Sequence, residues 1–251
     1  MNIRKPGRTN LIALLNLAKG DNERPHSKGC GAVTRAAPFG LFYPDNYCEA
    51  YRRAGEGAAC THYHKTAQES AGALAGIISL VVDGKSVRQA VRQVLSMTKN
   101  IEYSDHETDS ALRLALQLID EKTPPQEAFE KIGKGWIAEN VLAGAVYCSL
   151  KAKDFRSGVL MAVNHGGDSV GAVCGNILGT LHGVGAIPKG WLEHVELREF
   201  IERLTYIFHR VTYIKAIGQL DFYERKAEFA DIFIKNTSEE PQTPERRSLD
   251  G

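Results

Sequence analysis

Apolar residues recur at helical spacing along most of the chain. Residues 61–82 are predicted to form one long helix, because small residues recur at spacings suited to close helix contact and Asp83-Gly84 then supplies a C-cap and turn. Ser86 is placed to cap the next helix. The apolar stripe of that helix comprises Val87, Val91, Val94 and Leu95.

The same periodicity continues toward the C-terminus. Further helices are predicted over residues 110–119, 126–132, 136–150, 155–163, 170–181 and 195–209, with Pro125 in the first turn of the second of these. Period-two alternation nowhere lasts more than a few residues, so the pattern does not indicate a sheet. We therefore predict a single all-α domain over residues 1–235, followed by a polar, proline-containing and disordered tail over residues 236–251.

Composition narrows the class of protein. The chain of 251 residues has 43% hydrophobic and 24% charged residues and a net charge of +1, so neither a nucleic acid nor a membrane is an expected partner. The five cysteines are scattered without a CxxC pair, which predicts reduced thiols and a cytoplasmic protein. The N-terminus does not resemble a signal peptide. The longest apolar or small run, residues 71–82, falls short of the ~20 residues that a membrane span needs.

One predicted helix carries a basic face. Arg88, Arg92 and Lys99 lie opposite the apolar stripe that follows Ser86. Such a face could contact a phosphate backbone, but no aromatic residues interleave with the cations, which favours a solvated surface.

The first polar loop that interrupts the helical pattern contains Ser27-Lys28-Gly29-Cys30-Gly31. Two glycines separated by one residue let backbone N–H groups approach a ligand, and a following helical turn would favour an anion. A plain turn is the alternative interpretation.

The second polar stretch is Thr61-His62-Tyr63-His64. If these residues open a helix, the two histidines lie about 200° apart and do not point at one metal ion. We therefore expect His62 alone to reach a ligand hydroxyl.

The third stretch, Gly133-Lys134-Gly135-Trp136, precedes an apolar helix. We expect Gly135 to cap that helix and Trp136 to anchor it in the core.

The fourth stretch, from Asn164 to Ser169, is dense in polar groups around a Gly-Gly pair. Asp168 or Ser169 could serve only as an N-cap. An aspartate with a neighbouring hydroxyl also suits a hard cation such as Mg²⁺ or Mn²⁺.

Taken together, these segments resemble the ADP-ribosylglycohydrolase family, which includes the dinitrogenase reductase-activating glycohydrolases. The matching motifs, in order from about Arg4 to Leu204, are RKPGRT, SKGCGAVTRAAPFGL, THYHKTAQESAGALAGII, GKGWIAENVLAGAVYC, FRSGVLMAVNHGGDS, GAVCGNILGTLHG and IPKGWL. Because ordered matches of this length are far more specific than any one motif, the chain is identified as a member of the family.

The resemblance implies an orthogonal multi-helix bundle that uses two Mg²⁺ or Mn²⁺ ions to hydrolyse ADP-ribosyl conjugates. An ADP-ribosylated protein or another ADP-ribose conjugate is the implied partner. Asp168 is implied as the catalytic residue and, with Ser169, as a metal ligand. The implied substrate-binding residues are Ser27, Gly29, Cys30, Gly31, His62, His165, Gly166 and Gly167.

Two departures from the family pattern lower the expected activity. The chain resembles a truncated member, since the family's opening segment and its Thr-Asp-Asp motif of metal ligands have no counterpart in it. The family pattern Gly-Asp-Ser-Asp-Ser is shortened here, because Gly167-Asp168-Ser169 leads directly to Val170. One carboxylate does not balance two divalent cations.

We therefore expect metal-dependent hydrolysis to be impaired in this chain. The alternative is a non-catalytic member that binds ADP-ribose-like ligands or acts as a helical interaction module. A truncated bundle should also expose apolar helix faces and self-associate through them.

Overall fold

The computed structural model describes residues 7–99 and 106–216. Within these ranges the chain is helical, without a strand, and one isolated antiparallel bridge joins Gly29 to Ile137. The all-α prediction is confirmed. No described helix is both long and apolar enough to cross a membrane.

The chain divides into two compact units, Met1–Val195 and Glu196–Gly251. The predicted domain end at residue 235 and the predicted disordered tail over residues 236–251 lie outside the described residues. The helices of the first unit are α1 (Arg8–Ala18), η1 (Val33–Arg35), α2 (Ala37–Phe42), α3 (Tyr47–Ala59), α4 (Lys65–Val82), α5 (Val87–Thr98), α6 (Glu107–Asp120), α7 (Pro125–Ile132), α8 (Ala138–Lys151), α9 (Phe155–Gly166), α10 (Asp168–His182), η2 (Val184–Ala186) and α11 (Lys189–Glu193). The second unit contributes α12 (Arg198–Ala216).

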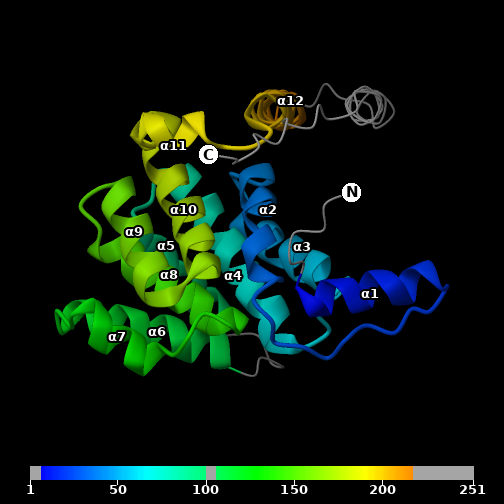
Figure 1. Ribbon diagram of the computed structural model, residues 1–251, viewed down its shortest axis with the longest axis horizontal. Coiled ribbons are helices and arrows are strands. Elements are labelled where there is room, and N and C mark those ends of the chain that lie inside the picture. The colour runs from blue at the N-terminus through cyan, green and yellow to red at the C-terminus, as the bar shows by residue number, and fades with distance from the viewer. Residues whose placement is uncertain (1–6, 100–105, 217–251) are drawn as a thin grey trace, which may run out of the picture. The chain divides into compact units, whose positions relative to one another are not determined.

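Two apolar helices form the centre of the first unit. In α4, 15 of 18 residues are buried, and in α8, 11 of 14. A helix that is apolar all round must be covered on every side. Helices α2, α3 and α5 pack against α4, while α6, α9 and α10 pack against α8, and α4 and α8 contact each other (Figure 1).

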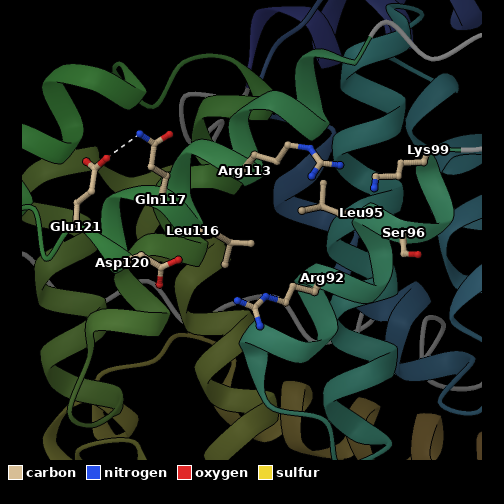
Figure 2. A pocket seen from close by; sticks show the side chains of 9 residues that line it. All are labelled: Arg92, Leu95, Ser96, Lys99, Arg113, Leu116, Gln117, Asp120 and Glu121. Carbon is tan, nitrogen blue, oxygen red and sulfur yellow. Dashed lines mark hydrogen bonds between the residues drawn. The ribbon is translucent and has the colours of Figure 1, made fainter.

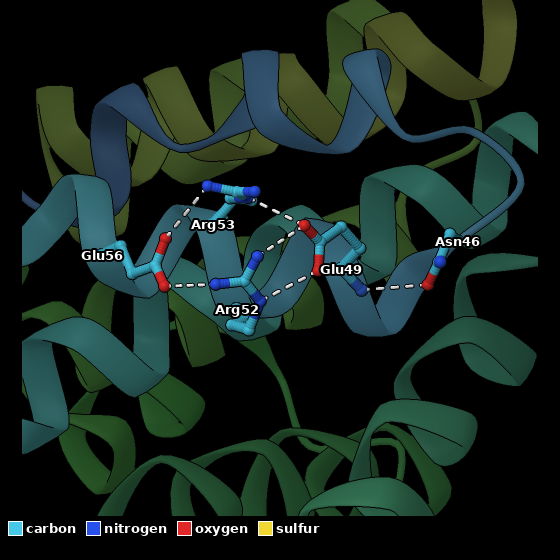
Figure 3. Close-up of polar contacts among 5 residues, drawn as sticks. All are labelled: Asn46, Glu49, Arg52, Arg53 and Glu56. Carbon is cyan, nitrogen blue, oxygen red and sulfur yellow. Dashed lines mark hydrogen bonds and ion pairs between the residues drawn. The ribbon is translucent and has the colours of Figure 1, made fainter.

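Helix α3 shows how a small apolar face and a charged face position one element. Its buried residues are all alanines, which let it approach α4 closely. On its outer face Arg52 and Arg53 pair with Glu49 and Glu56, and the side chain of Asn46 caps the helix by accepting from the backbone N–H of Glu49 (Figure 3). The two arginines hold the pKa of Glu49 at about 2.

Several predicted helix boundaries are confirmed. Ser86 forms a capping box with Gln89 at the start of α5, and Pro125 is the first residue of α7. The predicted helix start at Thr61 is wrong, because α4 begins at Lys65 and His64 is its N-cap, accepting from the backbone N–H of Thr66 at 3.2 Å. His62 therefore lies in the loop before the helix.

Candidate functional site

The glycine-containing loop from Ser27 to Gly31 is held by backbone hydrogen bonds to the segment before α8. The Cys30 N–H donates to the carbonyl of Trp136 at 3.1 Å, and the Ala138 N–H donates to the carbonyl of Lys28 at 2.8 Å. The hydroxyl of Ser27 accepts from the Gly29 N–H at 3.1 Å. Since these bonds already use the N–H groups of Gly29 and Cys30, neither N–H is free to bind an anion.

A side-chain contact joins this loop to the start of α10. The Cys30 thiol and the Ser169 hydroxyl are 3.3 Å apart. Asp168, exposed beside Ser169, accepts from the Ser169 N–H at 2.8 Å. Two of the segments predicted from the sequence therefore meet, and a carboxylate lies at their junction.

His62 lies directly beneath the two glycines of the loop. A Cβ added to Gly29 or to Gly31 would lie 3.2 Å from the imidazole ring, so larger residues would displace either the loop or the ring. The side chain of His62 is 1% exposed, and burial, together with the nearby Arg35 guanidinium, lowers its pKa to about 4. The imidazole is therefore neutral at physiological pH.

A chain of hydrogen bonds links Arg35 to His62 through Thr61. Arg35 donates to the Thr61 hydroxyl oxygen at 2.5 Å, and that hydroxyl lies 2.8 Å from Nδ1 of His62. The Thr61 hydroxyl has one proton and two lone pairs, so it can accept from Arg35 and still form a hydrogen bond with Nδ1 in either direction. The Nε2 edge of the ring faces the Gly29–Gly31 segment.

The arginine also fixes the base of the loop. Arg35 donates to the carbonyl of Gly31 and to the side chain of Asn10 in α1, both at 3.0 Å. Its guanidinium therefore ties η1, α1 and the loop together.

Lys28 anchors the loop through an ion-pair cluster that the sequence analysis did not identify. Its ammonium lies 2.7 Å from Glu107 of α6 and 2.6 Å from Glu139 of α8, and the Thr66 hydroxyl also donates to Glu107. Glu139 is 6% exposed, and in the described part of the chain its Oε2 has no hydrogen-bond partner. The available signal was an acidic residue, Glu139, at the start of the mostly apolar α8, because a buried carboxylate requires a cationic partner.

Gly135 allows a close approach between loops and does not cap a helix. A Cβ on Gly135 would lie 2.3 Å from the carbonyl oxygen of Gly166, at the end of α9. The N-cap of α8 is Ile137. The predicted capping role of Gly135 is therefore wrong, and the residue instead brings the GKGW segment against the α9–α10 junction.

Trp136 is not a core anchor. Its side chain is 77% exposed, whereas its carbonyl holds the Cys30 N–H. An indole left in solvent beside Cys30 has its face free to stack on a planar group.

The remaining residues predicted to bind substrate lie where α9 ends and α10 begins. Gly167 has φ +89° and connects the helices, with Gly166 as the last residue of α9. Gly167 is also the N-cap residue of α10, so the alternative that Asp168 or Ser169 is the N-cap is wrong. The ring of His165 stacks on Phe129 at a centroid distance of 6.0 Å, which gives this exposed side chain a partner of its own outside the Cys30–Ser169 contact.

Asp168 occupies the first position of α10, where a carboxylate is stabilised by the helix dipole. In the described ranges, no three His, Cys, Asp or Glu side chains are grouped so that they could hold a metal ion. The donors at the junction are one carboxylate and one hydroxyl, which is too few for two divalent cations. The described donor set therefore does not fit a dinuclear centre.

A sequence profile of the ADP-ribosylglycohydrolase family matches residues 2–216. A protein of unknown function from Archaeoglobus fulgidus is 34% identical over 81% of this chain and 66% of its own length. Two relatives are described as the ADP-ribosylarginine hydrolase Tri1. The Tri1 of Serratia proteamaculans is 25% identical over 73% of this chain and 47% of its own length. The Tri1 of Pseudomonas putida is 22% identical over 81% of this chain and 52% of its own length.

A solved structure described as an ADP-ribosylglycohydrolase-related protein complex superposes with a TM-score of 0.65. It is 28% identical in sequence, and the match covers 82% of this chain and 69% of the other. The chain thus spans about half of the Tri1 proteins and about two thirds of the archaeal relative. The profile match over most of the chain and the archaeal relative together establish that the chain belongs to the ADP-ribosylglycohydrolase family.

Proposed function

We propose that this chain binds the ADP-ribosyl group of a protein or small-molecule conjugate at the junction of the Ser27–Gly31 loop with Asp168 and Ser169. The observation that carries the proposal is the 3.3 Å contact between Cys30 and Ser169, which joins two segments 139 positions apart around one exposed carboxylate. The Tri1 relatives act, by their descriptions, on ADP-ribosylated arginine, which suggests that substrate class.

Two exposed groups suit such a ligand, and a buried one supports the loop beside them. Trp136 offers an exposed planar face to a base. The Asp168 carboxylate can accept hydrogen bonds from ribose hydroxyls, and the buried ring of His62 packs against Gly29 and Gly31 of the loop. Together they favour binding of a nucleotide sugar over binding of a bare anion.

We further propose that hydrolysis by this chain is impaired. If Mg²⁺ or Mn²⁺ takes part, Asp168 and Ser169 are the described donors, and they leave most of the coordination positions and charge of two ions unmatched. The Asp168 carboxylate could still hold a water molecule as a general base, because it lies exposed at the junction.

Calorimetry tests the proposed binding of ADP-ribose, and a turnover assay tests the proposed impairment of hydrolysis. We expect ADP-ribose to bind with a stoichiometry near one, and Gly29→Val to abolish binding because the new side chain would collide with His62. We expect little release of ADP-ribose from ADP-ribosylated arginine with Mg²⁺ present. Rapid turnover that disappears in Asp168→Ala would overturn the impairment, and absence of ADP-ribose binding would overturn the proposed function.

A non-catalytic interaction module is the second candidate. It is favoured by α1, where Leu14, Leu15 and Leu17 are each more than half exposed. Partner capture by a chain that does not bind ADP-ribose would support this candidate.

A further inference from the structure

A cleft of about 430 Å³ lies between α5 and α6, and none of its lining residues belongs to the candidate ADP-ribose site (Figure 2). Arg92 and Leu95 of α5 and Lys99, its C-cap residue, follow one another at spacings of three and four residues and so share one face. On α6, Arg113 and Leu116 share a face in the same way. The cleft therefore has apolar walls from both helices and cations from both helices.

The charges are separated along the cleft. Arg113 and Lys99 extend toward one another across Leu95, forming the basic end (Figure 2). Asp120 and Glu121 line the opposite, acidic end, where Asp120 accepts from Arg88 at 2.7 Å. A ligand that fits this pattern is negative at one end and carries hydrogen-bond donors at the other.

Among the described residues, the two cations at the basic end, Lys99 and Arg113, have no carboxylate partner. Within residues 7–99 and 106–216, no side-chain hydrogen bond or ion pair involves Lys99 or Arg113, nor Arg92, which points toward the Asp120 side of the cleft (Figure 2). The arginines of α3, by contrast, are paired with Glu49 and Glu56 (Figure 3). Cations that converge without partners repel each other, so an anion placed between them lowers the energy.

We propose that this cleft binds a small organic phosphate. The phosphate lies between Lys99 and Arg113, where a guanidinium can donate two parallel hydrogen bonds. The organic portion packs on Leu95 and Leu116, and its hydroxyl or amino groups face Asp120. A cleft of this volume falls within the ~300–1,000 Å³ range of small-molecule sites.

A nucleic acid strand fits the cleft less well. The acidic end would repel a continuing phosphate backbone, and none of the described residues that line the cleft is an aromatic that could stack on a base. The basic face of α5 is thus better suited to a single terminal phosphate than to a polyanion.

Calorimetry of the full chain with phenyl phosphate, inorganic phosphate and phenol tests the proposal, since none of these resembles a nucleotide. We expect phenyl phosphate to bind more tightly than inorganic phosphate, and phenol not to bind. The double variant Lys99→Gln/Arg113→Gln should weaken phenyl phosphate binding at least about tenfold, because two charge-assisted contacts are lost. Arg113→Lys, which keeps the charge, should weaken it less than the double variant does.

The matched control is Arg52→Gln/Arg53→Gln in α3, which removes the same net charge without changing a lining residue of the cleft. We expect it to leave phenyl phosphate binding unchanged, with the unfolding transition of each variant confirming the fold. Equal affinity in the Lys99/Arg113 variant would overturn the proposal. An equal loss in both double variants would also overturn it, since diffuse electrostatic attraction would then explain the binding.

Discussion

At the scale of single residues, the neutral His62 makes stability depend on pH. Its pKa is about 4 in the folded chain against about 6.5 in the unfolded one, so the unfolded state binds more protons between these values. The contribution of neutral His62 to the free energy of unfolding is fully present above pH 6.5 and is lost as the pH falls toward 4. The full loss is on the order of 3 kcal/mol.

We predict that His62→Gln removes this dependence. Denaturant unfolding of the native chain and of the variant at pH 7.5, 5.5 and 4.5 gives the difference in the free energy of unfolding at each pH. That difference should shrink as pH falls. A constant difference would show that His62 carries no such linkage.

The Lys28 cluster predicts strong coupling between two residues. Lys28→Met should destabilise the chain by about 1–3 kcal/mol, because the buried carboxylate of Glu139 then loses its only cation in the described structure. Glu139→Gln in the same chain should recover part of the loss, since a neutral amide needs no counter-charge. A double-mutant cycle measured by urea unfolding checks this, and strictly additive effects would contradict it.

The close contact at Gly135 can be tested by comparing an alanine substitution there with one at an open glycine. Gly135→Ala should cost about 1–3 kcal/mol, because the added methyl group would overlap the carbonyl oxygen of Gly166. Gly190→Ala in α11 should be neutral or slightly stabilising, since nothing lies within 4 Å of its added Cβ. Equal unfolding midpoints for the two variants would contradict this prediction, because they would show that the loop moves to accept the methyl group without loss of stability.

At the scale of elements, α1 differs from an ordinary surface helix, because its polar residues contact the protein and its leucines face solvent. Thr9 and Asn10 contact Ser27 and Arg35 of the protein body, and Ala13 is its only buried residue, while the leucines face outward. Covering such a face is favourable by about 25 cal/mol per Å² of apolar area.

We predict that two copies of the chain associate through α1, as the sequence analysis expected from exposed apolar faces. Leu14→Gln/Leu17→Gln should shift the chain toward monomer in sedimentation velocity. Val184→Gln, at an equally exposed apolar position outside α1, should not. A native chain that is monomeric at high concentration would contradict the prediction.

The existence of α5 and α7 was predictable from the sequence because their apolar residues recur with a strong helical period, and that of α8 because of its long alanine-rich apolar run. The start of α4 was not, because the half-buried Thr61 and the buried His62 are polar residues held by tertiary contacts with Arg35 and the glycine loop. The exposure of Trp136 was also missed, since a large aromatic beside an apolar helix usually lies in the core.

At the scale of the whole molecule, the candidate site is assembled from segments that each looked ambiguous alone. The sequence identified Ser27–Gly31, His62 and Asp168 by chemistry and family resemblance, but it did not show that Cys30 meets Ser169. It also did not show that Lys28 holds the loop to two helices. Both facts depend on tertiary distances between residues far apart in sequence, which local patterns do not encode.

The measurement that tests the central claim most directly is the fluorescence of Trp136 during titration with ADP-ribose. The chain has two tryptophans, so Trp191→Phe leaves Trp136 as the single reporter beside Cys30. We predict a saturable change in its emission that Gly29→Val abolishes. An emission spectrum that does not change with ADP-ribose, in a folded Trp191→Phe chain, would contradict binding at this junction.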